Sequence, residues 1–382
     1  MSNKQMIQTN RKKRNNAKLY PIYKMFSWDL LFYYSIQFLF YTITKQVPVS
    51  SIIIIEGIYQ FFNVILGIPA VVVNDVLGRR NSIVLGNIIL LFYVPTLIFL
   101  PGTMSILIAD FVFAIGYNIK SIAETNLLYD SVSTKGGDGL YSKIDSKGVS
   151  WYYIFDGVAS LVAGYLFVIN NYLPMIICFG FTFISTMLSF RFKEIYPKAN
   201  TRKTIKNSIT EYGKELKTSI KNVLKSKRIR ALILFGMVFT AIISISDTYR
   251  KDLLVELGIG AEQFSVILAL LSMLAGICVN LQRKIEHKFR NRTLCFLSTT
   301  YIISCILIAI SAIAFPNDIA IPIVLLLCVI QYIIRAIWWV LEEKYQKNFT
   351  TPEQRSKVSF IYAFFAQIGI SILVVLGGEP IG

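Results

Sequence analysis

The sequence predicts an all-α membrane protein that crosses a lipid bilayer many times, and two observations lead to this fold class. The first is a series of eleven apolar stretches, each close to the ~20 residues that a helix needs to cross a hydrocarbon core about 30 Å thick. The second is charge: 34 of the 39 Lys and Arg fall on alternate loops, and only Lys45, Arg250 and Lys251 fall on the other set. Because Lys and Arg are retained on the cytoplasmic face, the chain is expected to lie in the inner (cytoplasmic) membrane with its N-terminus in the cytoplasm.

The apolar stretches define the expected spans along the chain. These spans are 25–44, 52–74, 82–100, 104–129, 149–169, 173–190, 230–249, 260–281, 294–315, 319–341 and 358–377. They group into two bundles of six and five spans, 25–190 and 230–382, with a basic cytoplasmic tail over 1–24 and a connector over 191–229. The first stretch contains Asp29 and Gln37 and has no small-residue cleavage site, so it is predicted to be a retained helix rather than a signal peptide.

Composition excludes several classes of protein. The net charge of +17 comes from loop residues that flank apolar helices, so positive-inside bias explains it and nucleic acid is not an expected partner. With a single histidine, His287, placed in a loop and five cysteines within or at the ends of spans, neither a metal site nor a disulfide framework is expected. The sequence has no phosphate-binding Gly-x-x-x-x-Gly-Lys-Ser/Thr loop and no nucleophile–base constellation, so an enzyme and a cofactor are not expected.

The connector 191–229 contains a possible amphipathic helix. Its apolar residues recur every three or four positions, which places them on one helical face among lysines: Ile205, Ile209, Tyr212, Leu216, Ile220 and Val223. Such a helix can lie on the anionic cytoplasmic leaflet. It can equally be a solvated linker that packs on its own bundle.

The two bundles show correspondences at a nearly constant offset. The turn 75–81 after the second span resembles 286–292 after the eighth, and their leading acids are 211 residues apart. Lys120 and Arg335, in the fourth and tenth spans, are 215 apart and stand at similar depth. Repeated helical halves are typical of secondary transporters, which bind substrate near the midplane.

The turn 75–81 carries a resemblance to a known family. Its Asp-x-x-Gly-Arg-Arg segment is similar to the G-x-L-x-D-R-x-G-R-R signature of the major facilitator superfamily, although valines replace the first Gly, the Leu and the first Arg. Residues 120–131 and 355–359 resemble further segments of this family. The resemblance implies a conformational latch at Asp75, Gly78, Arg79 and Arg80. An ordinary positive-inside turn is the alternative reading.

The family resemblance implies two six-helix halves, and here it covers about residues 25–377. The family has twelve spans, whereas this sequence ends just past the eleventh. We therefore expect either a record that is cut short or a product that lacks the peripheral twelfth helix.

Polar residues inside the spans are candidate site residues because ionisable groups are expensive there. The resemblance implies that helices one, four, seven and ten line a central cavity, and three polar helix faces fall on these helices. The predicted cavity residues are Tyr33, Gln37, Lys120, Glu124, Arg335, Trp338, Trp339 and Glu342. The first-span residues Asp29, Tyr33, Gln37 and Tyr41 are spaced four apart, which predicts one polar stripe on a continuous helix.

Each of these faces has a structural alternative. Lys120 and Glu124, at i and i+4, are able to pair within one helix without any ligand. Asp29 is near the cytoplasmic end of its expected span, where an interfacial position is an alternative. Trp338 and Trp339 can belong to an aromatic belt at the membrane surface.

The hypothesis drawn from these residues is proton-coupled alternating access, with Asp29, Glu124 and Asp156 as proton carriers. Aromatic side chains beside mixed charges favour a hydrophobic or amphipathic compound over a sugar, and export over import. The fifth-helix Gly-Pro signature of the family's drug–proton antiporters is absent from 157–164. A monomeric transporter is expected, and the alternatives are an importer of a small solute or a truncated, non-transporting relic or membrane sensor.

Overall fold

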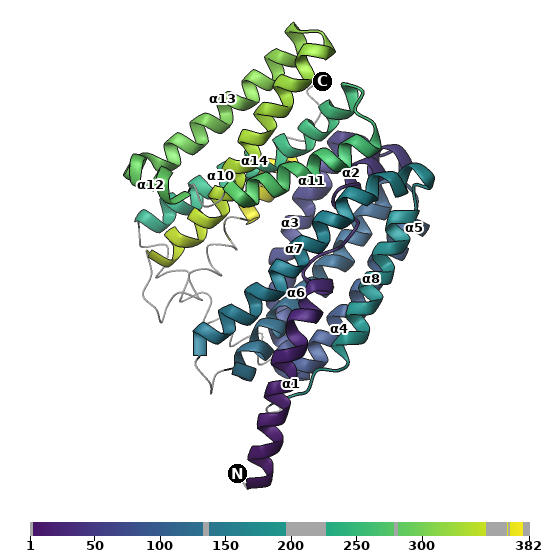
Figure 1. The fold of residues 1–382 in the computed structure, drawn as a ribbon, viewed down its shortest axis with the longest axis vertical. Helices are drawn as coiled ribbons and strands as arrows, with labels where there is room; N and C mark the ends of the chain where they lie inside the picture. The colour runs from purple at the N-terminus through teal and green to yellow at the C-terminus, as the bar shows by residue number, and fades with distance from the viewer. Residues whose placement is uncertain are drawn as a thin grey trace. The chain divides into compact units, whose positions relative to one another are not determined.

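The computed structural model describes residues 3–132, 137–195, 227–278, 282–348, 365 and 367–376. These residues form helices joined by short turns, and none of them lies in a β-strand (Figure 1). The predicted all-α class is therefore confirmed. The connector segment 196–226, the start of the eleventh expected span and the stretch 355–359 lie outside the described residues.

The chain divides into two compact units. Unit 1 comprises Met1–Val47 and Ile58–Leu216, and unit 2 comprises Pro48–Gly57 and Lys217–Gly382. Helix α3 (Val49–Leu77) therefore begins in unit 2 and continues in unit 1.

Unit 1 contains most of the first half of the chain. Besides α3, its helices are α1 (Asn3–Ser27), α2 (Gln37–Leu39), the π-helical turn η1 (Phe40–Thr44), α4 (Arg79–Leu91), α5 (Tyr93–Phe99), α6 (Gly102–Val132), α7 (Gly137–Ile169) and α8 (Leu173–Ser189). At one end of the unit Tyr20 and Tyr23 of α1 pack with Ala123 and Leu127 of α6 in a buried cluster. The first helix is thus anchored against the fourth span.

Unit 2 is built around three long helices and several shorter ones. Its helices are α10 (Lys227–Glu256), α11 (Ala261–Cys278), α12 (Gln282–Phe289), the 3-10 turn η3 (Arg290–Arg292), α13 (Thr293–Ala314), α14 (Asn317–Asn348) and the segment Gln367–Leu376. Its buried cluster joins α10, α13 and α14 through Phe239, Tyr301 and Trp338.

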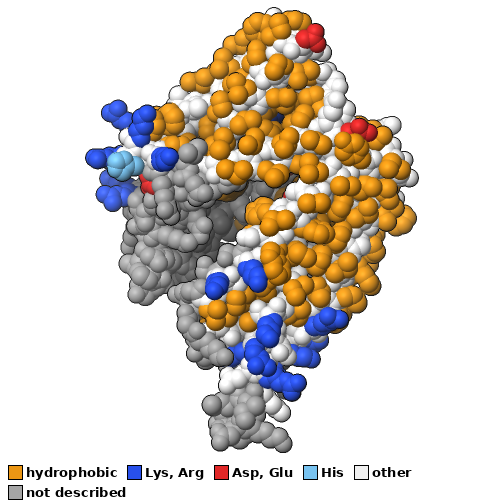
Figure 2. Space-filling model, viewed as in Figure 1, with side chains coloured by type: hydrophobic (Ala, Val, Ile, Leu, Met, Phe, Trp, Pro, Cys, Tyr) orange, Lys and Arg blue, Asp and Glu red, His pale blue; other side chains and the backbone are white. Residues whose placement is uncertain are grey.

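Seven described helices are long and apolar enough to cross a membrane, and three further apolar helices are shorter. Large apolar side chains cover the flanks of the helices in each unit (Figure 2), and extreme examples are Ile313, 87% exposed, and Phe99, 82% exposed. In water such a surface would be costly, whereas in lipid it is expected. The chain is a multi-pass membrane protein, although the described helices do not establish the predicted division into six and five spans.

Basic side chains gather at one end of each unit. In unit 1 they surround the N-terminal part of α1, and in unit 2 they surround α12 (Figure 2). The exposed basic residues at these ends include Lys12, Arg191 and Lys193 in unit 1 and Lys288 and Arg292 in unit 2. This clustering within each unit is what sorting of Lys and Arg to one membrane face produces.

The first helix differs from the sequence-based expectation at both ends. It begins at Asn3 rather than near residue 25, and it ends at Ser27 rather than near 44. The side-chain amide of Asn16 exchanges hydrogen bonds with the backbone of Lys193, at 2.8 and 3.0 Å, which ties the expected tail to the segment after α8. Hydropathy missed this part of the helix because its residues are mostly polar, many of them exposed, and contain no apolar run.

Helices α4 and α6 approach each other closely at a pair of glycines. A Cβ added to Gly86 would lie 2.7 Å from the carbonyl oxygen of Gly116, and one added to Gly116 would lie 2.8 Å from that of Gly86. Small residues at helix crossings allow this backbone approach in membrane proteins, where packing drives association.

We predict that Gly86→Ala destabilises unit 1 by about 1–3 kcal/mol, because the new methyl group forces the two backbones apart. The measurement is the thermal unfolding midpoint of the purified protein in detergent. Gly180→Ala is the matched control: its Cβ would meet nothing within 4 Å, and alanine favours a helix by up to about 1 kcal/mol. Equal midpoints for both variants would refute the close-packing argument.

Candidate functional site

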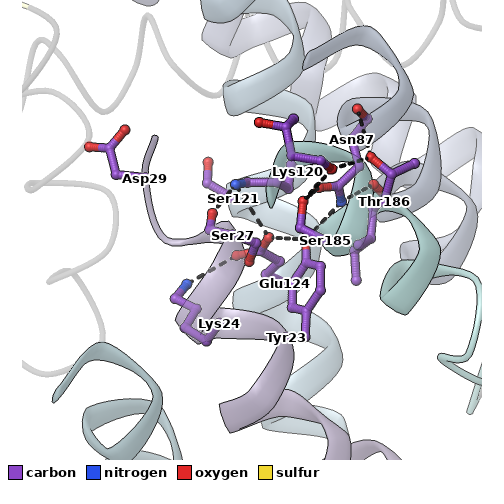
Figure 3. A network of polar contacts seen from close by, with 12 residues as sticks. Tyr23, Lys24, Ser27, Asp29, Asn87, Lys120, Ser121, Glu124, Ser185 and Thr186 are labelled. Atoms are coloured by element: carbon purple, nitrogen blue, oxygen red, sulfur yellow. Dashed lines mark hydrogen bonds and ion pairs between the residues drawn. The ribbon is translucent and has the colours of Figure 1, made fainter. Parts of the chain in front are cut away.

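The candidate site of unit 1 is centred on Glu124 of α6, which is 1% exposed. Its Oε1 accepts a hydrogen bond of 2.5 Å from the hydroxyl of Tyr23, and its Oε2 accepts one of 3.0 Å from the ammonium group of Lys24. Lys120, one turn earlier on α6, lies 3.8 Å from Oε1. Figure 3 shows the carboxylate between these partners. The predicted pairing of Lys120 with Glu124 is present, but the closer partners come from α1.

Polar side chains of α4 and α8 fix the orientation of Tyr23. The amide nitrogen of Asn87 on α4 donates to the Tyr23 hydroxyl at 2.7 Å, which leaves the tyrosine proton for Glu124. Ser185 on α8 in turn donates to the Asn87 side-chain oxygen at 3.3 Å. A chain of hydrogen bonds therefore runs from α8 through α4 and α1 to α6 (Figure 3). Connected networks of this kind hold a buried carboxylate in one geometry.

Lys120 also stabilises the end of the first helix. Its ammonium group donates to the backbone oxygen of Ser27, the last residue of α1. The C-terminal carbonyls of a helix carry partial negative charge and lack partners within the helix, so a buried cation is favourable there. Lys120 thus joins α1 to α6 independently of Glu124.

The predicted polar stripe of the first span is wrong, because the helix is broken between Ser27 and Gln37. Asp29 accepts hydrogen bonds from its neighbouring amide, Leu30 N, at 2.9 Å and from the Tyr34 hydroxyl at 2.6 Å. Such local side-chain bonding competes with helical bonding, and Phe32 adopts a positive φ of 63° in the same segment. Asp29 lies apart from the Glu124 network (Figure 3).

The other members of the predicted stripe still meet. Tyr33 and Tyr41 are hydrogen bonded through their hydroxyls, and Tyr93 of α5 donates to Tyr33. Gln37 donates to Tyr41 at 3.4 Å. These side chains form a cluster that packs the non-helical segment after Ser27, together with α2 and η1, against α5.

Asp156 of α7 is half-buried. A carboxylate partly buried within a membrane span is a candidate for holding a proton, because burial away from water disfavours its charged form.

The turn between α3 and α4 is attached to unit 1 through its arginines. Gly78 has a φ of 81°, a left-handed conformation that glycine adopts without strain. Arg79 donates to the backbone oxygen of Asn126 at 3.0 Å and forms an ion pair with Asp130, both on α6. The backbone amide of Arg80 donates to Glu194 at 2.9 Å. The turn is therefore clamped to α6 and to the segment after α8, while the side chain of Asp75 lies outside the described residues.

Unit 2 contains a second buried polar cluster, centred on Asp247 of α10. One carboxylate oxygen accepts from Arg250 and, at 3.3 Å, from Arg335 of α14, and the other lies 2.7 Å from Lys251. Arg250 also donates to Gln331 of α14, and its guanidinium carbon lies 4.8 Å from the centre of the Tyr332 ring. Three cations thus converge on one carboxylate.

The four predicted residues of α14 do not share one environment. Trp338 is fully buried, its ring packs against Phe235 and Phe239, and its Nε1 donates to Thr240 at 3.1 Å. Trp339 is 47% exposed. Trp338 therefore belongs to the buried cluster of unit 2 and does not line an accessible face.

Arg335 is partly exposed and contacts the Asp247 cluster, whereas Glu342, two turns further along α14, is buried. Of the four α14 residues, Arg335 and Trp339 therefore remain on an accessible face.

Sequence reasoning missed Tyr23, Lys24, Asn87 and the role of Asp247. Tyr23 and Lys24 lie in the expected tail 1–24, and Asp247 lies near the end of the expected span 230–249, so none of the three was among the candidate site residues. A usable signal existed: Asp247, Arg250 and Lys251 stand at i, i+3 and i+4, the spacing of one helical face. The described residues contain no group of three or more His, Cys, Asp and Glu placed to hold a metal ion.

Comparisons with known proteins agree with this architecture. A family model described as Major Facilitator Superfamily matches residues 25–374. A search of curated proteins finds no match. Among solved structures, nucleoside transporter NupG is similar with a TM-score of 0.69 at 12% identity, covering 96% of this chain and 90% of that one.

Two further solved structures share the fold. A D-xylose-proton symporter has a TM-score of 0.65 at 11% identity, covering 97% of this chain and 89% of that one. A bacterial homologue of the human lysosomal transporter Spinster has a TM-score of 0.62 at 13% identity, covering 98% and 82%. At these identities the likeness shows a common fold and nothing about the transported solute.

We predict that Glu124→Gln lowers the unfolding midpoint in detergent more than Lys24→Met does. Removing one partner of a buried ion pair costs about 3–5 kcal/mol, but after Lys24→Met the carboxylate keeps Lys120, whereas Glu124→Gln strands two lysines. The double variant should be no less stable than Glu124→Gln alone, because Lys24→Met removes one of the two stranded charges. Additive effects of the two substitutions would show that Lys24 and Glu124 do not stabilise each other.

Proposed function

This chain belongs to the Major Facilitator Superfamily, and we propose that it is a secondary transporter that moves a small solute across the cytoplasmic membrane by proton-coupled alternating access. The observation that supports proton coupling is the environment of Glu124. Glu124 is 1% exposed and has a tyrosine hydroxyl at 2.5 Å and a lysine ammonium group at 3.0 Å. Binding of one proton would neutralise its carboxylate, and a proton needs no additional space in this buried position.

Proton binding at Glu124 would weaken the contacts that join α1 to α6. The protonated acid no longer attracts Lys24 as an ion pair, and each intramembrane charge left without a partner costs at least about 2.5–3.5 kcal/mol on insertion scales. Asp29 and Asp156, two further carboxylates of the first and fifth expected spans, are the other candidate proton carriers. We assign coupling to these acids and the latch role to Gly78, Arg79 and Arg80, with Asp75 as a further candidate.

The proposed solute is a hydrophobic or amphipathic compound, and the proposed direction is export. Trp339 and Arg335 lie one turn apart on α14, and an exposed aromatic ring beside a guanidinium group suits such a ligand. The alternative of import has its own support, because one structurally similar protein is a proton symporter for D-xylose. We also place the N-terminus in the cytoplasm and take the monomer as the working unit.

Proton coupling is tested in proteoliposomes that contain a trapped pH-sensitive dye. A panel of amphipathic cations, anions and neutral aromatic compounds should include compounds that trigger proton movement in the wild-type protein. Glu124→Gln should abolish this movement while keeping exchange of labelled compound between the two sides, because solute binding does not need the Glu124 carboxylate.

The control for this experiment is Asp318→Asn, which neutralises an exposed carboxylate at the start of α14. It should behave like the wild-type protein. Full proton coupling in both Glu124→Gln and Asp156→Asn would contradict the assignment of the carriers. A folded wild-type protein that responds to no compound would support the non-transporting alternative.

Direction is a separate prediction and needs oriented membranes. Inside-out vesicles with an acidic lumen should accumulate a transported compound, and dissipating the proton gradient should release it. Right-side-out vesicles in an acidic bath, which have the same proton gradient toward the cytoplasmic face, are the control, and they should lose preloaded compound. Accumulation by right-side-out vesicles instead would establish import.

A further inference from the structure

We propose that the Asp247 cluster of unit 2 binds the anionic group of the transported solute, so that the substrate class is an organic carboxylate or phosphate. The inference deepens the proposed function and rests on it, but its evidence is separate from that for Glu124. It begins with a charge imbalance: Arg250, Lys251 and Arg335 all pair with one carboxylate, that of Asp247.

Among the described residues of unit 2, Glu56 is a further acid whose charge is also attracted by Lys251 and Arg335. Glu56, at the start of α3 and within unit 2, accepts hydrogen bonds from the hydroxyls of Ser244 at 2.6 Å and Thr248 at 3.4 Å. Even with Glu56 and Asp247 both ionised, the five groups carry one excess positive charge. An anion would balance it.

The excess charge lies inside the membrane-spanning part of the helices. Asp247 is nine residues before the end of the candidate span Lys227–Glu256, and Arg335 is four before the end of the candidate span Asn317–Trp339. At ~1.5 Å per residue these separations are about 14 and 6 Å. An excess cation within a membrane span is rare and marks a substrate pathway by default.

Arg335 is the group that presents this charge to a ligand. Its side chain is 40% exposed, whereas that of Arg250 is 4% exposed. Contact of a guanidinium group with hydrocarbon is unfavourable, so its exposed part is expected to face water. Arg335 makes one hydrogen bond to the described residues, from Nη1 to Asp247. The rest of its planar fork of donors is suited to a carboxylate or phosphate.

Behind Arg335, Arg250 supplies fixed positive charge. It is held by Asp247, by Gln331 and by the face of Tyr332, and its buried Nε has no hydrogen-bond partner among the described residues. Gln331 is itself anchored by donation to Ser304 of α13 at 3.0 Å. Arg250 is thus held in position before a ligand binds, and Asp247 is only one of the groups that hold it.

The test measures binding by the purified full-length chain and requires no transport. The probes are benzoate, phenyl phosphate and inorganic phosphate, with benzamide as the neutral analogue of benzoate. Benzoate or phenyl phosphate should raise the unfolding midpoint in detergent in a saturable way, and benzamide should not. The comparison of the two anions separates a carboxylate site from a phosphate site. Stabilisation by inorganic phosphate alone, by benzamide as strongly as benzoate, or by none of the probes would overturn the proposal.

Two substitutions should change the affinity in opposite directions. Arg335→Gln should weaken anion binding roughly 10- to 100-fold, because it removes a charge-assisted hydrogen bond. Asp247→Asn should strengthen it, because the anion no longer competes with a carboxylate for the three cations. A purely structural role for the cluster would weaken binding in both variants. Arg292→Gln, on the exposed turn η3, is the matched control and should bind like the wild-type protein.

The outcomes also separate this inference from the proposed function. Glu124→Gln should keep anion binding while losing proton coupling. Anion binding without any transport would leave the site standing and refute the transporter, whereas transport that Arg335→Gln leaves unchanged would refute the anion site alone. If Asp247→Asn does not fold, the comparison of Arg335→Gln with Arg292→Gln still shows whether Arg335 binds the anion.

Discussion

Compensation of charge inside the membrane is the constraint on which the arrangement of each unit depends. Glu124 draws its partners from α1, so α1 has to dock against α6, and its polar N-terminal half is held beside the segment after α8. Lys120 takes the backbone oxygen at the end of the same helix, which makes the break after Ser27 tolerable. A non-helical segment at membrane depth is stable only when its polar groups are satisfied by protein or water. Here Lys120, Asp29 and the tyrosine hydroxyls supply these contacts.

The two units meet this constraint with different charge balances. In unit 1 one acid faces two lysines, and both of its oxygens have close partners. In unit 2 one acid faces three cations, one of which is substantially exposed. Lys120 and Arg335, which the sequence places at corresponding depths, thus have different surroundings. The pseudo-repeat conserves the position of a cation on the fourth helix of each half, while the acids that pair with it lie on α6 in unit 1 and on α10 in unit 2.

Hydropathy and charge predicted the fold class and most helix positions, because lipid selects for long apolar runs regardless of their neighbours. The same criterion failed for α1 and for the end of α10, where polar residues continue a helix because side chains from other helices satisfy them. For this reason the sequence pattern did not identify Tyr23 and Lys24 as site residues, because their role depends on Glu124, a hundred residues away. The i, i+4 pair on α6 was predictable because it is local. The burial of Trp338 and exposure of Trp339 were not, because which side of a helix packs is a tertiary property.

The two clusters are suited to different ligands on physical grounds. A solute group that reached Glu124 would have to displace Tyr23 or Lys24 from a nearly inaccessible position, whereas a proton needs no space. The side chain of Arg335 is 40% exposed and can be reached by a larger anion. On the proposed assignment, export of an anion in exchange for a proton moves negative charge out and positive charge in. In a cell that is negative inside, both movements run down the electric field, each gaining about 2.3 kcal/mol per elementary charge per 100 mV. Import of the same anion with one proton would be electrically neutral and would gain nothing from the potential. Under the proposed assignment the membrane potential therefore favours export of the anionic solute over its import with one proton, for a reason that is independent of the aromatic residues.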